Sequence, residues 1–172
     1  MRWRNPARLQ SPDTAGVIAA PPLMLGAALM VGALLHAAMP IPVVSDQRAL
    51  IRPAGGALIA IGAALSAWVV QVFRAAPTPV SPGRETTRLV QIGPYRYSRN
   101  PDYLGQILVY IGASLAANTW WPLFLSPLVL VAIQRGVVRR EERYLEARFG
   151  RDYRDYMDRV PCWLSCISMI AN

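Results

Sequence analysis

The chain is poor in the residues that most metal centres and hydrolytic sites use. Its 172 residues include one histidine, two cysteines and no lysine, so all eighteen basic residues are arginines. Cys162 and Cys166 lie four residues apart, a spacing that fits neither a CxxC redox pair nor, alone, a zinc site. The sequence has no Ser-His-Asp order, Walker loop or Rossmann glycine pattern. It therefore predicts no bound metal.

Charge is absent from three long stretches of the chain. Residues 14–45, 53–73 and 103–134 contain no Asp, Glu, Lys or Arg, and 53% of all residues are hydrophobic. Each stretch reaches the roughly 20 residues that a helix needs to cross a bilayer core. The first stretch is also longer than the apolar region of a secretory signal, which is about 7 to 15 residues. These features indicate an integral membrane protein.

The third stretch is longer than one span and is interrupted at AANTWWP, residues 116–122. Asn118 and Thr119 are suited to a tight turn, and the following tryptophans to a membrane interface. We therefore expect a helical hairpin in the C-terminal half. The prediction is an all-α integral membrane fold in a single domain, 1–172, with about four spans, at 17–39, 54–73, 101–117 and 120–138. Small residues of the second span, Gly55, Gly56, Ala60, Gly62, Ala63 and Ala64, predict close approach of another helix.

The arginines are unevenly distributed between the loops. The N-terminal arm has 3, the connector 74–100 has 5 and the tail from residue 135 has 8, which leaves only Arg48 and Arg52 elsewhere. By the positive-inside rule, both termini, the connector and the tail are cytoplasmic. The net charge of +8 also raises the question of nucleic acid. Because the arginines flank apolar spans and form no nucleic-acid-binding motif, membrane lipids are the expected partners.

The tail carries an amphipathic pattern. Apolar and aromatic residues recur at steps of three and four, which predicts a cytoplasmic amphipathic helix. Gly150 is expected to divide this helix, and Pro161 to bend or end it. With arginines on its other face, the helix is expected to lie on the membrane or pack over the connector. The pattern comprises Leu145, Phe149, Tyr153, Tyr156, Met157, Val160 and Leu164.

Two segments are candidates for a site. In GPYRYSRNPDYLG, residues 93–105, Asn100, Pro101 and Asp102 have the order of a helix start. The surrounding tyrosines and arginines allow two interpretations, a membrane anchor or a pocket for a polar cofactor at the helix start. Glu141 and Glu142 likewise are either solvated, with weak pairs such as Arg139–Glu142 and Arg143–Glu146, or bind ribose hydroxyls or an amino group.

Two longer segments together resemble a known family. RLVQIGPYRYSRNPDYLGQIL, residues 88–108, and RREERYLEARFGRDYRDYMDRVPCWL, residues 139–164, look like the isoprenylcysteine carboxyl methyltransferase family in its bacterial branch. Phospholipid methyltransferases are relatives of that family. The resemblance covers about residues 86–164, which it implies to be a cofactor-binding methyltransferase core. It also implies a multi-pass protein of a bacterial inner membrane.

The resemblance implies transfer of a methyl group from S-adenosylmethionine to a lipophilic acceptor, most closely a carboxylate of an isoprenylcysteine-like molecule. It assigns no catalytic residue, but Arg139 and Arg140 are candidates for orienting the substrate. Two departures concern the substrate: Asn100 stands where many members have histidine, and Val137 where carboxylate-modifying members have arginine. The residues implied to border the cofactor are Thr87, Arg88, Leu89, Val90, Tyr95, Asn100, Pro101, Asp102, Tyr103, Glu141 and Glu142.

Two other functions fit parts of the sequence. A membrane NADPH-dependent reductase of the sterol-reductase type has similar C-terminal motifs around its Arg-Asn/His-Pro-x-Tyr segment. A non-enzymatic membrane scaffold would use the tail only to bind anionic lipid or a protein partner. Binding of S-adenosylmethionine, of NADPH or of neither discriminates the three. The sequence does not define the oligomeric state.

Overall fold

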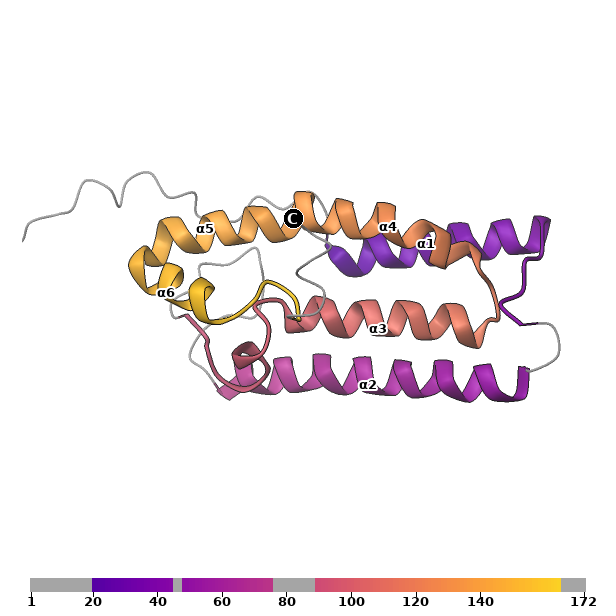
Figure 1. The fold of residues 1–172 in the computed structure, drawn as a ribbon, viewed down its shortest axis with the longest axis horizontal. Helices are drawn as coiled ribbons and strands as arrows, with labels where there is room; N and C mark the ends of the chain where they lie inside the picture. The colour runs from indigo at the N-terminus through magenta and orange to yellow at the C-terminus, as the bar shows by residue number, and fades with distance from the viewer. Residues whose placement is uncertain (1–19, 45–47, 76–88, 165–172) are drawn as a thin grey trace, which may run out of the picture.

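A computed structural model describes residues 20–44, 48–75 and 89–164 of the protein (Figure 1). These residues form helices and contain no strand, so the predicted all-α class is confirmed for them. Figure 1 shows helical rods side by side, with α3 between α2 and the layer of α1 and α4. The elements are α1 (Pro21–Ala38), α2 (Arg48–Ala75), the 3-10 turn η2 (Gly93–Arg96), α3 (Pro101–Ala116), α4 (Trp121–Ile133), the π turn η3 (Gln134–Val138), α5 (Arg139–Phe149) and α6 (Arg151–Arg159).

Three helices of the described chain are long and apolar enough to cross a membrane. They are Pro21–Ala38, Ala49–Ala75 and Trp121–Phe149. The sequence predicted about four spans, and α3 is the helix that makes the difference. Its 16 residues extend about 24 Å, which is less than the roughly 30 Å of a bilayer core. By length and composition, the structure therefore supports three spans.

Two predicted spans are parts of longer helices. The second helix begins at Arg48 and contains Pro53, whereas the predicted span begins after that proline. Pro53 is the sixth residue of α2 and thus lies beyond the four residues whose N–H groups lack a partner within the helix, so it removes one internal hydrogen bond, which membrane helices tolerate. The fourth predicted span does not end at residue 138, because α4 continues through η3 into α5 as one rod (Figure 1).

Glycines bring α2 and α3 into close contact. A Cβ atom placed on Gly55 would lie 2.6 Å from the Gly112 carbonyl oxygen, and one on Gly62 would collide with the Gly105 carbonyl. Two of the six predicted small residues are therefore placed correctly, since Gly55 and Gly62 are buried against α3. The prediction is wrong for the other four, because they lie on the exposed side of α2. They are Gly56, Ala60, Ala63 and Ala64.

The turn between α3 and α4 is joined to the segment that follows α1. Asn118 adopts a left-handed backbone with φ 51°, which asparagine tolerates better than most residues. Its side chain accepts a hydrogen bond from the Val44 N–H (3.0 Å) and donates one to the Val44 carbonyl (2.9 Å). The Trp121 indole donates to the Met39 carbonyl at 2.7 Å. These bonds hold the end of the bundle farthest from α5 together.

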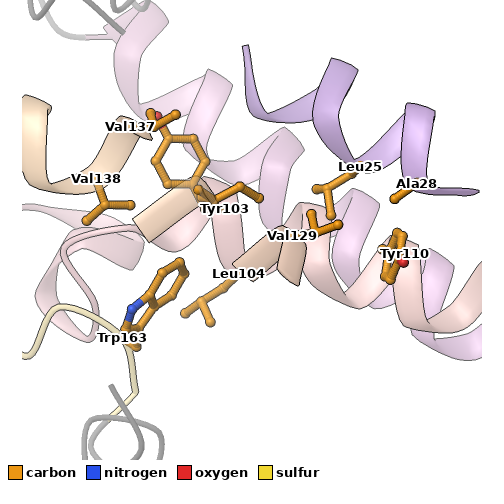
Figure 2. Close-up of a cluster of buried hydrophobic side chains, with 10 residues drawn as sticks. Leu25, Ala28, Tyr103, Leu104, Tyr110, Val129, Val137, Val138 and Trp163 are labelled. Atoms are coloured by element: carbon orange, nitrogen blue, oxygen red, sulfur yellow. The ribbon is translucent and has the colours of Figure 1, made fainter. Parts of the chain in front are cut away.

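The hydrophobic core lies where the first half of α3 meets α1, α4 and η3 (Figure 2). The Tyr110 hydroxyl donates to the Pro122 carbonyl and connects α3 with α4 inside the bundle. Trp163, from beyond α6, enters the same core beside Leu104. The last described segment, after α6, is thus packed against the start of α3. The core residues are Leu25, Ala28, Tyr103, Leu104, Tyr110, Val129, Ile133, Val137, Val138 and Trp163.

Candidate functional site

The start of α3 has the predicted order of residues but a different use of the first one. Asn100 occupies the N-cap position and Pro101 the first turn, yet the Asn100 side chain makes no cap hydrogen bond. Its amide instead donates to the Cys162 carbonyl at 3.0 Å, 62 residues away in the sequence. Asp102 accepts a bond of 2.8 Å from Gln106 in the next turn. Asn100 therefore connects the helix start to the tail, which local capping rules could not reveal.

Tyr103 joins the two candidate segments directly. Its hydroxyl lies 2.9 Å and 2.8 Å from the two carboxylate oxygens of Glu141, to which it donates. Tyr103 is buried in the core, and Glu141 lies in the first turn of α5, half-buried beside it. Each Glu141 oxygen has further lone pairs. The carboxylate can therefore accept bonds from hydroxyl or amino groups of a ligand.

Glu142 has a different partner from the one expected. It forms an ion pair of 2.9 Å with Arg99, and the two side chains are only 22% and 13% exposed. The predicted Arg139–Glu142 pair is wrong, because Glu142 faces the connector rather than its own helix. The other predicted pair is also wrong, because Glu146 pairs with Arg154 of α6 at 3.4 Å instead of with Arg143.

The tail packs over the connector. The Arg99 N–H donates to the Pro161 carbonyl (3.0 Å), the Ser98 hydroxyl to the Cys162 carbonyl (3.2 Å) and the Tyr156 hydroxyl to the Tyr95 carbonyl (2.7 Å). Of the two placements predicted for the tail helix, the structure has the one over the connector. We refer to these contacts between residues 91–100 and 153–163 as the clamp.

The amphipathic pattern of the tail accounts for most of the clamp. Tyr153, Tyr156 and Val160 form a buried cluster, against which Leu145, Phe149 and Met157 pack. Gly150 divides the helix with φ 57°, as predicted, and α6 ends before Pro161. Leu164 departs from the predicted pattern because it lies beyond the helix end and is 46% exposed.

Burial also keeps the tyrosine hydroxyls and the cysteine thiol at the clamp protonated. It raises the pKa of the Tyr95, Tyr153 and Tyr156 hydroxyls above their usual value, and the nearby charges of Asp102 and Glu142 add to the shift for Tyr95 and Tyr153. All three tyrosines are therefore neutral donors at physiological pH. Burial likewise raises the pKa of the Cys162 thiol, and the charge of Glu142 adds to this shift.

The remaining predicted residues are spread around this centre. Thr87 and Arg88 lie outside the described residues. Leu89 packs against the tyrosine cluster, Val90 is half-buried, and the Tyr95 ring meets Phe73 edge-on at 5.6 Å between centroids. Arg139 and Arg140 lie in the first turn of α5, with Arg139 exposed and Arg140 half-buried. Arg139 lines a hollow to which Glu141 does not contribute.

Four residues of the clamp and its surroundings were not predicted as part of the site: Ser98, Gln134, Cys162 and Trp163. Ser98 is 1% exposed, and the Cys162 carbonyl accepts bonds from both Ser98 and Asn100. The Trp163 indole donates to Gln134 at 2.9 Å, which fixes the end of the tail against η3. Trp163, two residues after the helix-ending Pro161, was the signal in the sequence for this contact, because a buried indole N–H needs an acceptor.

Among the described residues, no group of three or more His, Cys, Asp or Glu side chains could hold a metal ion. The site instead offers a carboxylate held by a tyrosine hydroxyl, next to a helix start. A helix start favours anionic groups, and a carboxylate favours hydroxyl or amino groups. Such a pair of features suits a polar organic ligand with groups of both kinds.

The fold and this site define an all-helical membrane protein with a candidate ligand site at one end of its bundle. A family model described as phospholipid methyltransferase matches residues 50–152, which is more than half of the chain. The chain therefore belongs to the phospholipid methyltransferase family. The match spans α2, α3, α4 and α5, and it includes both Tyr103 and Glu141.

A relative with a more specific name covers part of the chain. The protein named Protein-S-isoprenylcysteine O-methyltransferase from Schizosaccharomyces pombe is 32% identical over 79 residues. The matched region is 46% of this chain and 34% of the yeast protein. The chain thus matches about a third of the length of that relative. No solved structure matches the chain.

Proposed function

We propose that the protein is an S-adenosylmethionine-dependent methyltransferase that acts on a lipophilic acceptor, most closely a carboxylate of an isoprenylcysteine-like molecule. The observation that carries the proposal is the contact between Tyr103 and Glu141, which are 38 residues apart. Family membership supports methyl transfer as the reaction. The name of the yeast relative supports an oxygen atom as the acceptor.

The described residues suit the polar groups of S-adenosylmethionine. Glu141 would accept hydrogen bonds from ribose hydroxyls or the amino group, while Tyr103 holds the carboxylate in place. The first turn of α3 would receive the cofactor carboxylate at its N–H groups. Leu89, Val90 and Tyr95 would supply apolar and aromatic surface to the cofactor; Leu89 packs on the tyrosine cluster and Tyr95 against Phe73. When bound, the cofactor supplies the methyl group to be transferred.

The proposed acceptor needs no general base from the protein. A carboxylate oxygen is already deprotonated, so the site must mainly align the acceptor and exclude water. Val137 has no charge and is fully buried in the core, so it cannot orient the acceptor carboxylate. Of the two arginines that the sequence offers for orienting the carboxylate, we retain Arg140, at the start of α5, because Arg139 lines a hollow to which Glu141 does not contribute.

We also propose that α3 is a fourth, short transmembrane helix and that both termini are cytoplasmic, in a bacterial inner membrane. After Asp102, α3 has no charged residue, and it packs along α2 through glycines. A helix of 16 residues can be accommodated by local thinning of the bilayer. Labelling of single cysteines placed near Trp120 and Arg96 tests this topology: reaction of both from the same side contradicts it.

The function is tested by equilibrium binding to the purified full chain in detergent. Saturable binding of S-adenosylmethionine without binding of NADPH is the expected result. Binding of NADPH alone would instead favour a reductase of the sterol-reductase type. With S-adenosylmethionine binding established, transfer of a radiolabelled methyl group to a farnesylcysteine analogue tests the acceptor. Transfer to a phospholipid amine and not to the analogue would contradict the carboxylate.

A further inference from the structure

A basic hollow lies on a different face of α5 from Glu141. Residues two apart in an α-helix point about 200° apart around its axis, so Arg139 and Arg143 diverge from Glu141. The hollow has a volume of about 540 Å³, within the range of small-molecule sites. Its lining comes from η3, α5 and α6, at the end of the bundle where the clamp lies (Figure 1). The lining residues are Arg135, Arg139, Glu142, Arg143, Glu146 and Met157.

The positive charge of this hollow is not matched by the acids that line it. Glu142 is paired with Arg99 at 2.9 Å, and Glu146 with Arg154 at 3.4 Å; both arginines lie outside the lining. Within the described chain, Arg135, Arg139 and Arg143 have no such carboxylate partner. Arg143 uses one N–H for the Arg139 carbonyl, and a guanidinium has five. Three arginines spaced four residues apart therefore present unused donors to one volume.

The position of the hollow along the rod indicates what kind of anion it meets. The apolar run of α4 ends at Ile133, two residues before Arg135. Leu130 and Val131, in the preceding turn, are exposed and would face the acyl chains of a bilayer. The hollow thus lies where the rod leaves the hydrocarbon, at the depth of lipid phosphates. The neighbouring apolar surface favours a lipid over a soluble anion, because only a lipid has acyl chains that can contact it.

We propose that Arg135, Arg139 and Arg143 form a binding site for the phosphate group of an anionic membrane phospholipid. The planar guanidinium fork matches phosphate oxygens in pairs, and basic pockets at the membrane surface bind lipid headgroups. Met157 gives the hollow an apolar wall from α6. The site is separate from the Tyr103–Glu141 contact and does not depend on methyl transfer.

The test uses the purified full chain in neutral detergent micelles, titrated calorimetrically with dioctanoyl phosphatidylglycerol. Saturable binding is expected, and Arg135→Gln/Arg139→Gln/Arg143→Gln should weaken it by at least about ten-fold, since each loses charged hydrogen bonds. The matched control is Arg74→Gln/Arg96→Gln/Arg151→Gln, which removes three exposed arginines outside the hollow. This control should change the affinity by less than about two-fold, because distant surface charges are screened.

Three results would overturn the proposal. They are the absence of saturable binding, equal weakening by both triple variants, and displacement of the lipid by inorganic phosphate at comparable concentration, which would make free phosphate the ligand. Dioctanoyl phosphatidylcholine should bind at least about ten-fold more weakly, because its headgroup has no net charge. If the triple variant loses its helical circular dichroism, Arg139→Gln alone replaces it, with Arg151→Gln as its control.

Discussion

Arg99 and Glu142 form a 2.9 Å ion pair across the interface between the connector and α5, and both side chains are largely shielded from water. Arg99 also donates from its guanidinium to the Met157 carbonyl of α6, at 3.4 Å. One side chain thus links the connector to both helices of the tail. Arg99 therefore belongs to the clamp, and its pair with Glu142 joins the clamp to α5 next to Glu141.

Removing one partner of this pair is expected to destabilise the protein more than removing both. Arg99→Ala leaves the Glu142 carboxylate poorly hydrated and should lower the free energy of unfolding by about 2 kcal/mol. Arg99→Met/Glu142→Met should recover at least half of that loss, since no charge remains buried. Unfolding in mixed detergent and SDS micelles, followed by circular dichroism, measures both. Equal stability of the wild type and Arg99→Ala would contradict a structural role for the pair.

The affinity for S-adenosylmethionine should depend on Glu141. Glu141→Gln keeps the shape of the side chain but loses the charge, and should weaken binding by about 1 to 3 kcal/mol. Tyr103→Phe should have a smaller effect in the same direction, because it removes only the group that orients the carboxylate. Calorimetric titration of the full chain checks both variants. Glu146→Gln is the control, since its exposed carboxylate lies on another face; unchanged affinity in Glu141→Gln would contradict the assigned role.

Two neighbouring glycines of α2 allow a matched test of the helix contact. A side chain at Gly55 would meet the backbone of α3 at 2.6 Å, whereas nothing lies within 4 Å of a Cβ atom at Gly56. Gly55→Leu should therefore lower the free energy of unfolding by about 1 to 3 kcal/mol or prevent folding, the usual result of overpacking. Gly56→Leu should be near neutral. Similar losses for both variants in SDS unfolding would exclude this packing.

The Cys162 thiol reports on the clamp. Because burial and the Glu142 charge raise its pKa, less thiolate is present at pH 7.5 than in an exposed cysteine. In a Cys166→Ser background, alkylation by iodoacetamide should be slow, and its rate should rise with pH later than that of a small thiol. Arg99→Ala removes a cation that lowers this pKa, but it also opens the clamp, so faster alkylation there would show that access dominates. A rate in the parent like that of unfolded protein would contradict the half-buried position of Cys162.

The sequence predicted the helices better than it predicted their partners. The elements predicted from local signals lie at the expected places. These signals are the charge-free runs, the Asn-Pro start of α3 and the glycine in the tail. The hydrogen bond from Asn100 to Cys162 does not act locally, because it joins residues 62 positions apart. Helical spacing assigned Glu142 to Arg139, whereas tertiary packing brought Arg99 closer. Glycine positions alone also could not tell which side of α2 faces α3.

The π turn at Gln134–Val138 accommodates one extra residue. It thereby separates the orientation of the lipid-facing residues of α4 from the orientation of the residues of α5. In an uninterrupted α-helix, the residues that face lipid in α4 would fix by their phase which residues of α5 face the connector. The π turn resets that phase near the membrane exit, as single π turns in functional helices commonly do. The orientation of Glu141 toward Tyr103 is therefore not dictated by which residues of α4 face lipid.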